Sequence, residues 1–424
     1  MRCLLAALAM VIATIAHGAV DDHVHLGVAS CATGVCHGKL SPQTDSNVWL
    51  NEYRVWSAED RHARAYLTLG SAESKAMAAK LGIASAQTAK ICLDCHADNV
   101  PADKRGRKFQ ISDGIACEAC HGGAQLWIES HTEPGVTHAD NIARGLYPSE
   151  DPGERAELCL NCHMGAADRY ATHVIMGAGH PRLSFELDAF STNQPAHFDV
   201  DEDYRRRKGD VTGFRLWLTG QVVGAQRMLS LQASAWLDAP VGLFPELALY
   251  DCQSCHHAMD DVRLVTTGAG PGIKPGTLRL NDDHLRVLAV VAGVIDAEGR
   301  AELATRSQAL IRAGQTSVAA VRTAAADLDR WIGARRSAWS KRAFGRDEVV
   351  AVRRALVAAA AGGDLSDYGS AEQVYLAVDS LNIALGDGGA MRQAVDELYA
   401  AVENDQTYRP SRFTAAARAL LSRL

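Results

Sequence analysis

The chain has 424 residues, enough for two or three domains, and a formal net charge of −7 at pH 7. Its charged side chains are intermixed and form no basic stripe, so we exclude nucleic acid as a partner. Aromatic residues make up only 6% of the chain, and alanine-rich stretches fill much of its second half. This composition predicts a mainly α fold.

Residues 1–19 have the pattern of a secretory signal peptide. An arginine precedes an apolar run that is too short to span a bilayer, and small residues follow around Gly18 and Ala19. No later segment reaches the roughly 18 apolar residues that a transmembrane helix needs. We therefore expect an exported, periplasmic protein with no transmembrane segment in the mature chain.

Ten cysteines beyond the signal peptide fall into five pairs, and a histidine directly follows the second cysteine of every pair. Four pairs have the spacing CxxCH, whereas the first, "CATGVCHG", has four residues between its cysteines. The five motifs are Cys31, Cys36 and His37; Cys92, Cys95 and His96; Cys117, Cys120 and His121; Cys159, Cys162 and His163; and Cys252, Cys255 and His256.

Three kinds of site compete for these motifs. A disulfide framework is possible in an exported protein, but it gives no reason for the adjacent histidines. Structural zinc uses four ligands from cysteine and histidine, which fits five repeated triplets poorly. Covalent haem c explains every residue, because the two thiols form thioethers to the porphyrin and the histidine binds iron. We expect haem at the four regular motifs.

The wider first motif is the exception in spacing. It keeps the histidine next to the second cysteine, and the small residues Ala32, Thr33 and Gly34 could bulge without disturbing either thioether. A local disulfide between Cys31 and Cys36 remains the alternative. We therefore expect five haems, or four if this pair does something else.

The second axial ligand of each iron must come from elsewhere, and imidazole is its most common source. A predicted helix over 51–70 puts His62 in an apolar stripe, which makes it the strongest candidate. His131 follows His121 too distantly to bind the same iron. His23, His138, His197 and His257 are weaker candidates, and His284 is expected to be structural. Five histidines are predicted as further metal ligands: His62, His131, His173, His180 and His25.

The distribution of the motifs divides the chain. We predict a loop-rich multihaem cytochrome c domain over 20–265, a Gly- and Pro-rich linker over 266–280, and an all-α helical domain over 281–424. The last part should form a bundle of four to six helices. Gly362 and Gly363 should end one helix, a capping box at Ser370 and Gln373 should start the next, and Pro410 should begin the last.

The motifs resemble those of multihaem cytochromes c of the type found in ammonia oxidation. The likeness is carried by "SCATGVCHG", "WSAEDRHARAY", "CLDCHA", "DGIACEACHGGA", "CLNCHMG" and "DCQSCH", and it spans about residues 25–260. That family includes a tetrahaem cytochrome that accepts electrons from hydroxylamine oxidoreductase. The resemblance implies that His62 and His131 are distal ligands. A fifth site and the C-terminal helices depart from the family pattern.

Two functions from different classes remain open. The first is an electron carrier that serves a redox partner protein through about five covalently bound haems, with the C-terminal helices free to contact another subunit. The second is an oxidoreductase that acts on a small nitrogen or sulfur compound at a haem with an open distal face. The spare histidines favour electron transfer.

Overall fold

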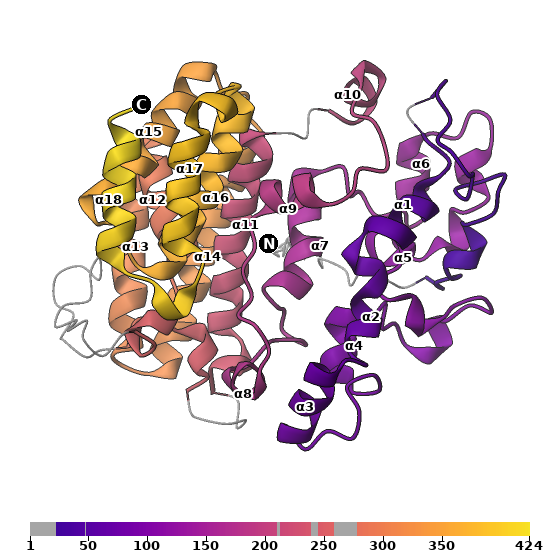
Figure 1. The fold of residues 1–424 in the computed structure, drawn as a ribbon, viewed down its shortest axis with the longest axis horizontal. Coiled ribbons are helices and arrows are strands. Elements are labelled where there is room, and N and C mark those ends of the chain that lie inside the picture. The colour runs from indigo at the N-terminus through magenta and orange to yellow at the C-terminus, as the bar shows by residue number, and fades with distance from the viewer. Residues whose placement is uncertain (1–22, 47, 210–212, 239–244, 258–277) are drawn as a thin grey trace, which may run out of the picture.

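The computed structural model describes residues 23–46, 48–209, 213–238, 245–257 and 278–424 (Figure 1). The predicted signal peptide and residues 266–277 of the predicted linker lie outside these ranges. The described residues form 18 α-helices joined by turns and short 3-10 helices, and they contain no β-strand. The prediction of a mainly α fold, with a loop-rich part followed by a helical bundle, is confirmed.

The first part of the chain consists of short helices separated by loops. Its longest helix has 12 residues, and loops of comparable length connect several of the others. Its helices are α1 (Glu52–Glu59), α2 (Ala65–Thr68), α3 (Ala72–Lys80), α4 (Lys90–His96), α5 (Cys117–His121), α6 (His138–Ile142), α7 (Pro152–His163), α8 (His173–Ala178), α9 (Leu187–Asn193) and α10 (Glu202–Lys208).

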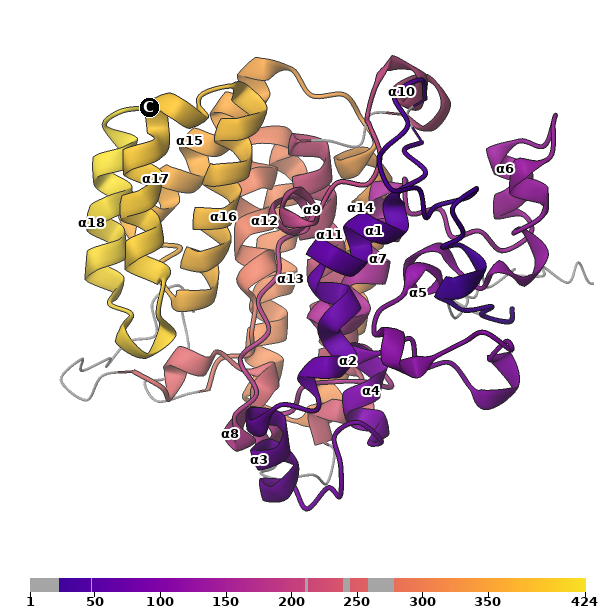
Figure 2. The ribbon, with the colours of Figure 1, turned by 45° about the vertical axis from the view of Figure 1, so that its right-hand side comes forward.

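Long helices form a bundle on the opposite side of the molecule (Figures 1 and 2). The predicted apolar stripe is its core: Leu303, Leu310, Leu328 and Ile332 are all at most 1% exposed. The helices are α11 (Phe214–Ala233), α12 (Asp283–Ile295), α13 (Ala297–Gly314), α14 (Val318–Ser340), α15 (Arg346–Gly362), α16 (Tyr368–Leu385), α17 (Gly388–Val402) and α18 (Pro410–Leu421).

Helix α11 joins the two parts. Its Trp217, Leu218 and Val222 are fully buried in the same core as α12–α18. Leu216 and Val223, also on α11, belong to a second buried cluster with Leu160 of α7. The predicted domain boundary assigns this helix to the haem-bearing part, but α11 packs as a member of the bundle. Its burial on both sides follows from a sequence that is apolar on more than one face.

Two of the three predicted helix ends in the bundle agree with the structure. Gly363 has the left-handed conformation that ends α15, and Pro410 is the first residue of α18, as predicted. The capping box at Ser370 and Gln373 is wrong, because α16 begins earlier and the side chain of Asp367 accepts the hydrogen bond from the Ser370 backbone N–H. The bundle also has more helices than the four to six predicted.

The helix predicted over 51–70 is interrupted. Asp60 has extended backbone angles and separates α1 from a 3-10 turn at Arg61–Arg64, after which α2 begins. The carboxylate of Asp60 accepts a hydrogen bond from the backbone N–H of His62 at 2.9 Å. This capping interaction competes with continued α-helix and starts the new turn directly at His62.

Candidate haem-binding sites

The regular cysteine motifs occupy single helical turns. Three of them end at the last residue of a helix, namely His96 of α4, His121 of α5 and His163 of α7, and the fifth motif includes a 3-10 turn at Cys252–Ser254. Residues three and four apart lie on one side of a helix, so a single turn presents both thiols and the imidazole together. The motifs are called sites 1 to 5 in chain order, beginning with Cys31.

Site 1 keeps the essential backbone contact despite its wider spacing. The N–H of His37 donates to the carbonyl of Cys31 at 3.1 Å, and at site 5 the N–H of His256 donates to the carbonyl of Cys252 at 2.8 Å. The added residues form a tight turn, in which a side chain at Gly38 would collide with the carbonyl of Ala32. The turn therefore accommodates the two extra residues, and the backbone hydrogen bond between His37 and Cys31 is kept.

Each motif histidine faces a second histidine from a distant part of the chain. The ring centroids of the five pairs are 6.1–6.5 Å apart. Every pair combines one motif histidine with one histidine outside the motifs. The pairs are His37 with His131, His96 with His180, His121 with His197, His163 with His62, and His256 with His173.

This spacing fits one metal ion between two imidazoles. A metal–nitrogen bond is about 2.0–2.1 Å long, and the nitrogen lies about 1.1 Å from the ring centre, so two axial imidazoles should have centroids about 6.2–6.4 Å apart. The five measured separations, from 6.1 to 6.5 Å, agree with this value. The residues present therefore fit a haem iron with two histidine ligands at all five sites.

Four of the predicted distal candidates belong to these pairs: His62, His131, His173 and His180. The fifth partner, His197, is one of the weaker candidates of the sequence analysis. Counting could not have found it, because His25 already supplies a fifth candidate for the five motifs.

His25 lies outside the five pairs. Its side chain is 1% exposed, and its Nδ1 is 2.6 Å from Oδ2 of Asp98. The adjacent backbone N–H groups of Leu26 and Gly27 donate to the buried carboxylate of Glu118 at 2.7 Å each. These contacts fasten the segment that precedes site 1 onto site 3.

His284 is buried in the bundle, with Nδ1 2.8 Å from Oε1 of Gln221. This placement agrees with the structural role expected for it. Burial lowers the pKa of its imidazole to about 4, so the ring is neutral at physiological pH.

Acceptors behind the ligand histidines orient several of the rings. Nδ1 of His37 is 2.9 Å from Oε2 of Glu52, and Nδ1 of His62 is 2.9 Å from Oδ1 of Asp60. At site 2 the acceptors are backbone carbonyls, at 3.2 Å for His96 and 2.8 Å for His180. A ring that donates through Nδ1 presents Nε2 to a metal.

Cysteines of different motifs lie next to one another. The Cys31 and Cys117 side chains lie within hydrogen-bonding reach of each other, and so do the Cys95 and Cys162 side chains. Cys159 and Cys162 both act electrostatically on Cys120. Site 1 therefore adjoins site 3, site 2 adjoins site 4, and sites 3 and 4 are neighbours.

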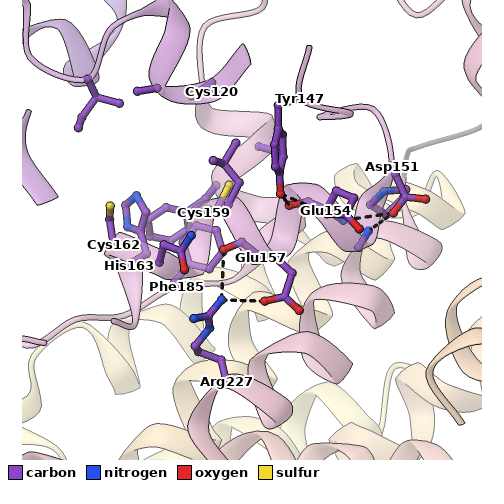
Figure 3. Close-up of a pocket in the computed structure, with 18 of the residues that line it drawn as sticks. Cys120, Tyr147, Asp151, Glu154, Glu157, Cys159, Cys162, His163, Phe185 and Arg227 are labelled. Atoms are coloured by element: carbon purple, nitrogen blue, oxygen red, sulfur yellow. Dashed lines mark hydrogen bonds and ion pairs between the residues drawn. The ribbon is translucent and has the colours of Figure 1, made fainter. Parts of the chain in front are cut away.

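A cavity of about 2060 Å³ lies between the short helices and the bundle. It exceeds the roughly 300–1,000 Å³ of ordinary small-molecule pockets, and it is lined by residues of sites 2, 3 and 4. Figure 3 shows Cys159, Cys162 and His163 of α7 at its wall, with Cys120 nearby. The Phe185 ring stacks on His163 at 4.8 Å. The volume and the converging thiols fit several porphyrins.

A smaller cavity of about 110 Å³ connects sites 4 and 5. His163 and Cys252 line it together with His284, Tyr368 and Glu372 from the bundle. Arg182 reaches across this cavity, since its Nη2 is 2.6 Å from Oε2 of Glu372 and its guanidinium lies over the Tyr368 ring. The bundle therefore supplies part of the surroundings of site 5.

Among the described residues, no three His, Cys, Asp or Glu side chains converge closely enough to hold a bare metal ion. None of the ten motif cysteines is joined to another in a disulfide. No helix in the described ranges is both long and apolar enough to cross a membrane.

Residues 30–122, less than a quarter of the chain, match the family model for cytochrome c554 and c-prime. This match supports a multihaem c-type cytochrome of electron transfer, a class of protein that binds haem c covalently. The matched segment contains sites 1 to 3 and His62. Neither a curated protein nor a solved structure matches the chain.

Proposed function

We propose that the protein is a periplasmic electron carrier with five haems c, each bound by two histidines. The single observation that carries this proposal is the set of five histidine pairs with centroids 6.1–6.5 Å apart. Haem supplies an iron that gains and loses one electron. The paired histidines would hold such an iron from both sides, which suits electron transfer.

The contacts between motifs support an order for the sites. Site 1 adjoins site 3 through Cys31 and Cys117, and site 3 adjoins site 4 through Cys120 and Cys159. From site 4 the neighbours are site 2, through Cys162 and Cys95, and site 5, across the smaller cavity. We infer a path that begins at site 1, passes sites 3 and 4, and ends at sites 2 and 5.

The same pairs argue against the alternative function. An oxidoreductase of a small nitrogen or sulfur compound needs one iron with an open distal face. All five motif histidines instead face a partner, among them His96 with His180 and His121 with His197. Arg182, a cation at the smaller cavity, is paired with Glu372. Electron transfer to a redox partner protein is therefore the favoured function.

The C-terminal bundle covers the last site in this proposal. Tyr368 and Glu372 of α16 line the cavity that also contains Cys252. Asp251, which precedes Cys252, lies 3.7 Å from the buried Arg279, and that guanidinium is 3.2 Å from Asp367 at the start of α16. These ion pairs fasten site 5 to the bundle, so we expect the bundle to hold the fifth haem rather than to act as a separate enzyme.

Haem counting tests the proposal. A pyridine haemochrome assay on protein matured with the c-type haem attachment machinery should give five haems per chain. The double variant Cys31→Ser with Cys36→Ser should give four. The control Ser57→Ala, at an exposed serine of α1, should still give five. A wild-type count of four would assign Cys31 and Cys36 to another role.

A further inference from the structure

One short helix carries the carboxylates of two different sites. Glu52 is the first residue of α1, and Asp60 directly follows its last residue. Glu52 contacts His37, the motif histidine of site 1, while Asp60 contacts His62, the histidine paired with site 4. The helix is held in place by Trp56, whose indole N–H donates to the carbonyl of Ile115 at 3.0 Å.

Glu52 is fixed by hydrogen bonds to both of its carboxylate oxygens. Oε2 is 2.9 Å from Nδ1 of His37, and Oε1 accepts the backbone N–H groups of Trp49 and Leu50 at 2.9 Å each. Leu50 has a φ of 57°, the one left-handed conformation among the described non-glycine residues. Such a conformation is strained for leucine. The loop therefore adopts an unfavourable backbone geometry where it presents two donors to Glu52.

Asp60, like Glu52, accepts hydrogen bonds at both of its carboxylate oxygens. Its Oδ1 accepts both the backbone N–H and Nδ1–H of His62 at 2.9 Å, and its Oδ2 accepts the side-chain amide of Gln194 at 3.1 Å. The side chain is 8% exposed. Three donors therefore surround the two carboxylate oxygens of this buried side chain, an arrangement that suits a carboxylate anion.

We propose that Glu52 and Asp60 are positioning residues that lower the reduction potentials at sites 1 and 4. This inference rests on the proposed function. A carboxylate that accepts Nδ1–H makes the imidazole a stronger electron donor and places negative charge near the metal, and both effects favour ferric over ferrous iron. At site 2 both histidines instead face neutral backbone carbonyls, so the carboxylate effect distinguishes sites 1 and 4 from site 2.

Potentiometric titration of the purified five-haem protein, followed by visible spectroscopy, tests this inference. In Asp60→Asn the amide oxygen can still accept from His62, and Gln194 can turn its own amide to match, so the shape is kept and only the charge is lost. We expect one of the five haem potentials to rise, with its ferric-to-ferrous equilibrium shifted about tenfold, which corresponds to about 59 mV for one electron. Glu52→Gln should raise the potential of a different haem.

The matched control is Glu73→Gln, which removes one negative charge from an exposed residue of α3 that lines neither cavity. It should leave all five potentials within a small fraction of that shift, since charge in water is strongly screened. Glu52→Asp, which restores the anion, should return the site 1 potential toward the wild-type value. This rescue separates the effect of charge from a loss of loop structure.

The inference and the proposed function fail in different ways. Unchanged potentials in an Asp60→Asn protein that still has five low-spin haems would overturn the tuning role alone. A shift as large in Glu73→Gln would also overturn it, because the effect would then come from long-range charge. A wild-type protein without five low-spin haems would instead contradict the proposed function.

Discussion

Replacement of His131 by alanine should convert one haem of five to a high-spin, five-coordinate form. His131 faces His37 with ring centroids 6.3 Å apart and planes 15° from parallel, and it is exposed, so its loss should not disturb the core. Alanine cannot reach the iron. Since the five pairs are separate, the change should affect one fifth of the total haem.

The assay is spectroscopic. Ferric His131→Ala should show a high-spin electron paramagnetic resonance signal, and the reduced variant should bind about one carbon monoxide per chain. His138→Gln is the matched control, because His138 contacts Glu150 at 2.7 Å and belongs to none of the five pairs. A His131→Ala protein whose haems all stay low-spin and do not bind carbon monoxide would refute the assignment of this histidine.

Three further outcomes are expected. His197→Ala should open one haem to carbon monoxide, while His25→Gln should open none; the opposite pattern would restore His25 as the ligand. Burial raises the pKa of Glu186 to about 8, so it is protonated in the folded protein and ionised in the unfolded chain between about pH 4.5 and 8. The free energy of unfolding therefore falls as pH rises through this window, by up to about 1.4 kcal/mol per pH unit. Glu186→Gln should reduce this pH dependence in urea unfolding, and an equal slope of unfolding free energy against pH in variant and wild type would exclude this. Trp217→Ala, at a fully buried residue of α11, should destabilise the bundle by about 3–5 kcal/mol in the same assay, and a loss below about 1 kcal/mol would contradict its core position.

The attachment motifs could be predicted from sequence because all of their residues lie within one or two turns of the chain. Cys92, Cys95 and His96 are close in any helical turn, so their spacing alone indicates their chemistry. The partner histidines are different. His62 and His163 meet only after the chain has folded, and no local pattern in either segment specifies the other.

Two differences between the sequence predictions and the structure have particular physical causes. His25 precedes Cys31 closely, but Asp98 holds its ring in a buried contact and it belongs to none of the five pairs. The helix predicted through His62 is broken by Asp60, whose carboxylate competes for the local backbone donors. The same carboxylate also orients the His62 ring, so the exception to helix periodicity coincides with a residue that we propose as a ligand.

The position of α11 could not be predicted because its apolar residues cover more than one face, so the sequence does not show whether it packs on the bundle or on the short helices. It is apolar enough to pack against α14 on one side and α7 on another, and the break in composition at the linker comes only later in the chain. Tertiary packing, rather than the distance along the chain from the last motif, determines that α11 joins the bundle.

The spin state of the wild-type protein tests the central claim most directly. All five ferric haems should give low-spin electron paramagnetic resonance signals, and the fully reduced protein should show no spectral change with carbon monoxide. This result would follow from five irons that each have two histidine ligands. A stoichiometric high-spin signal, or binding of carbon monoxide by untreated protein, would contradict the account and would favour an enzyme with an open haem.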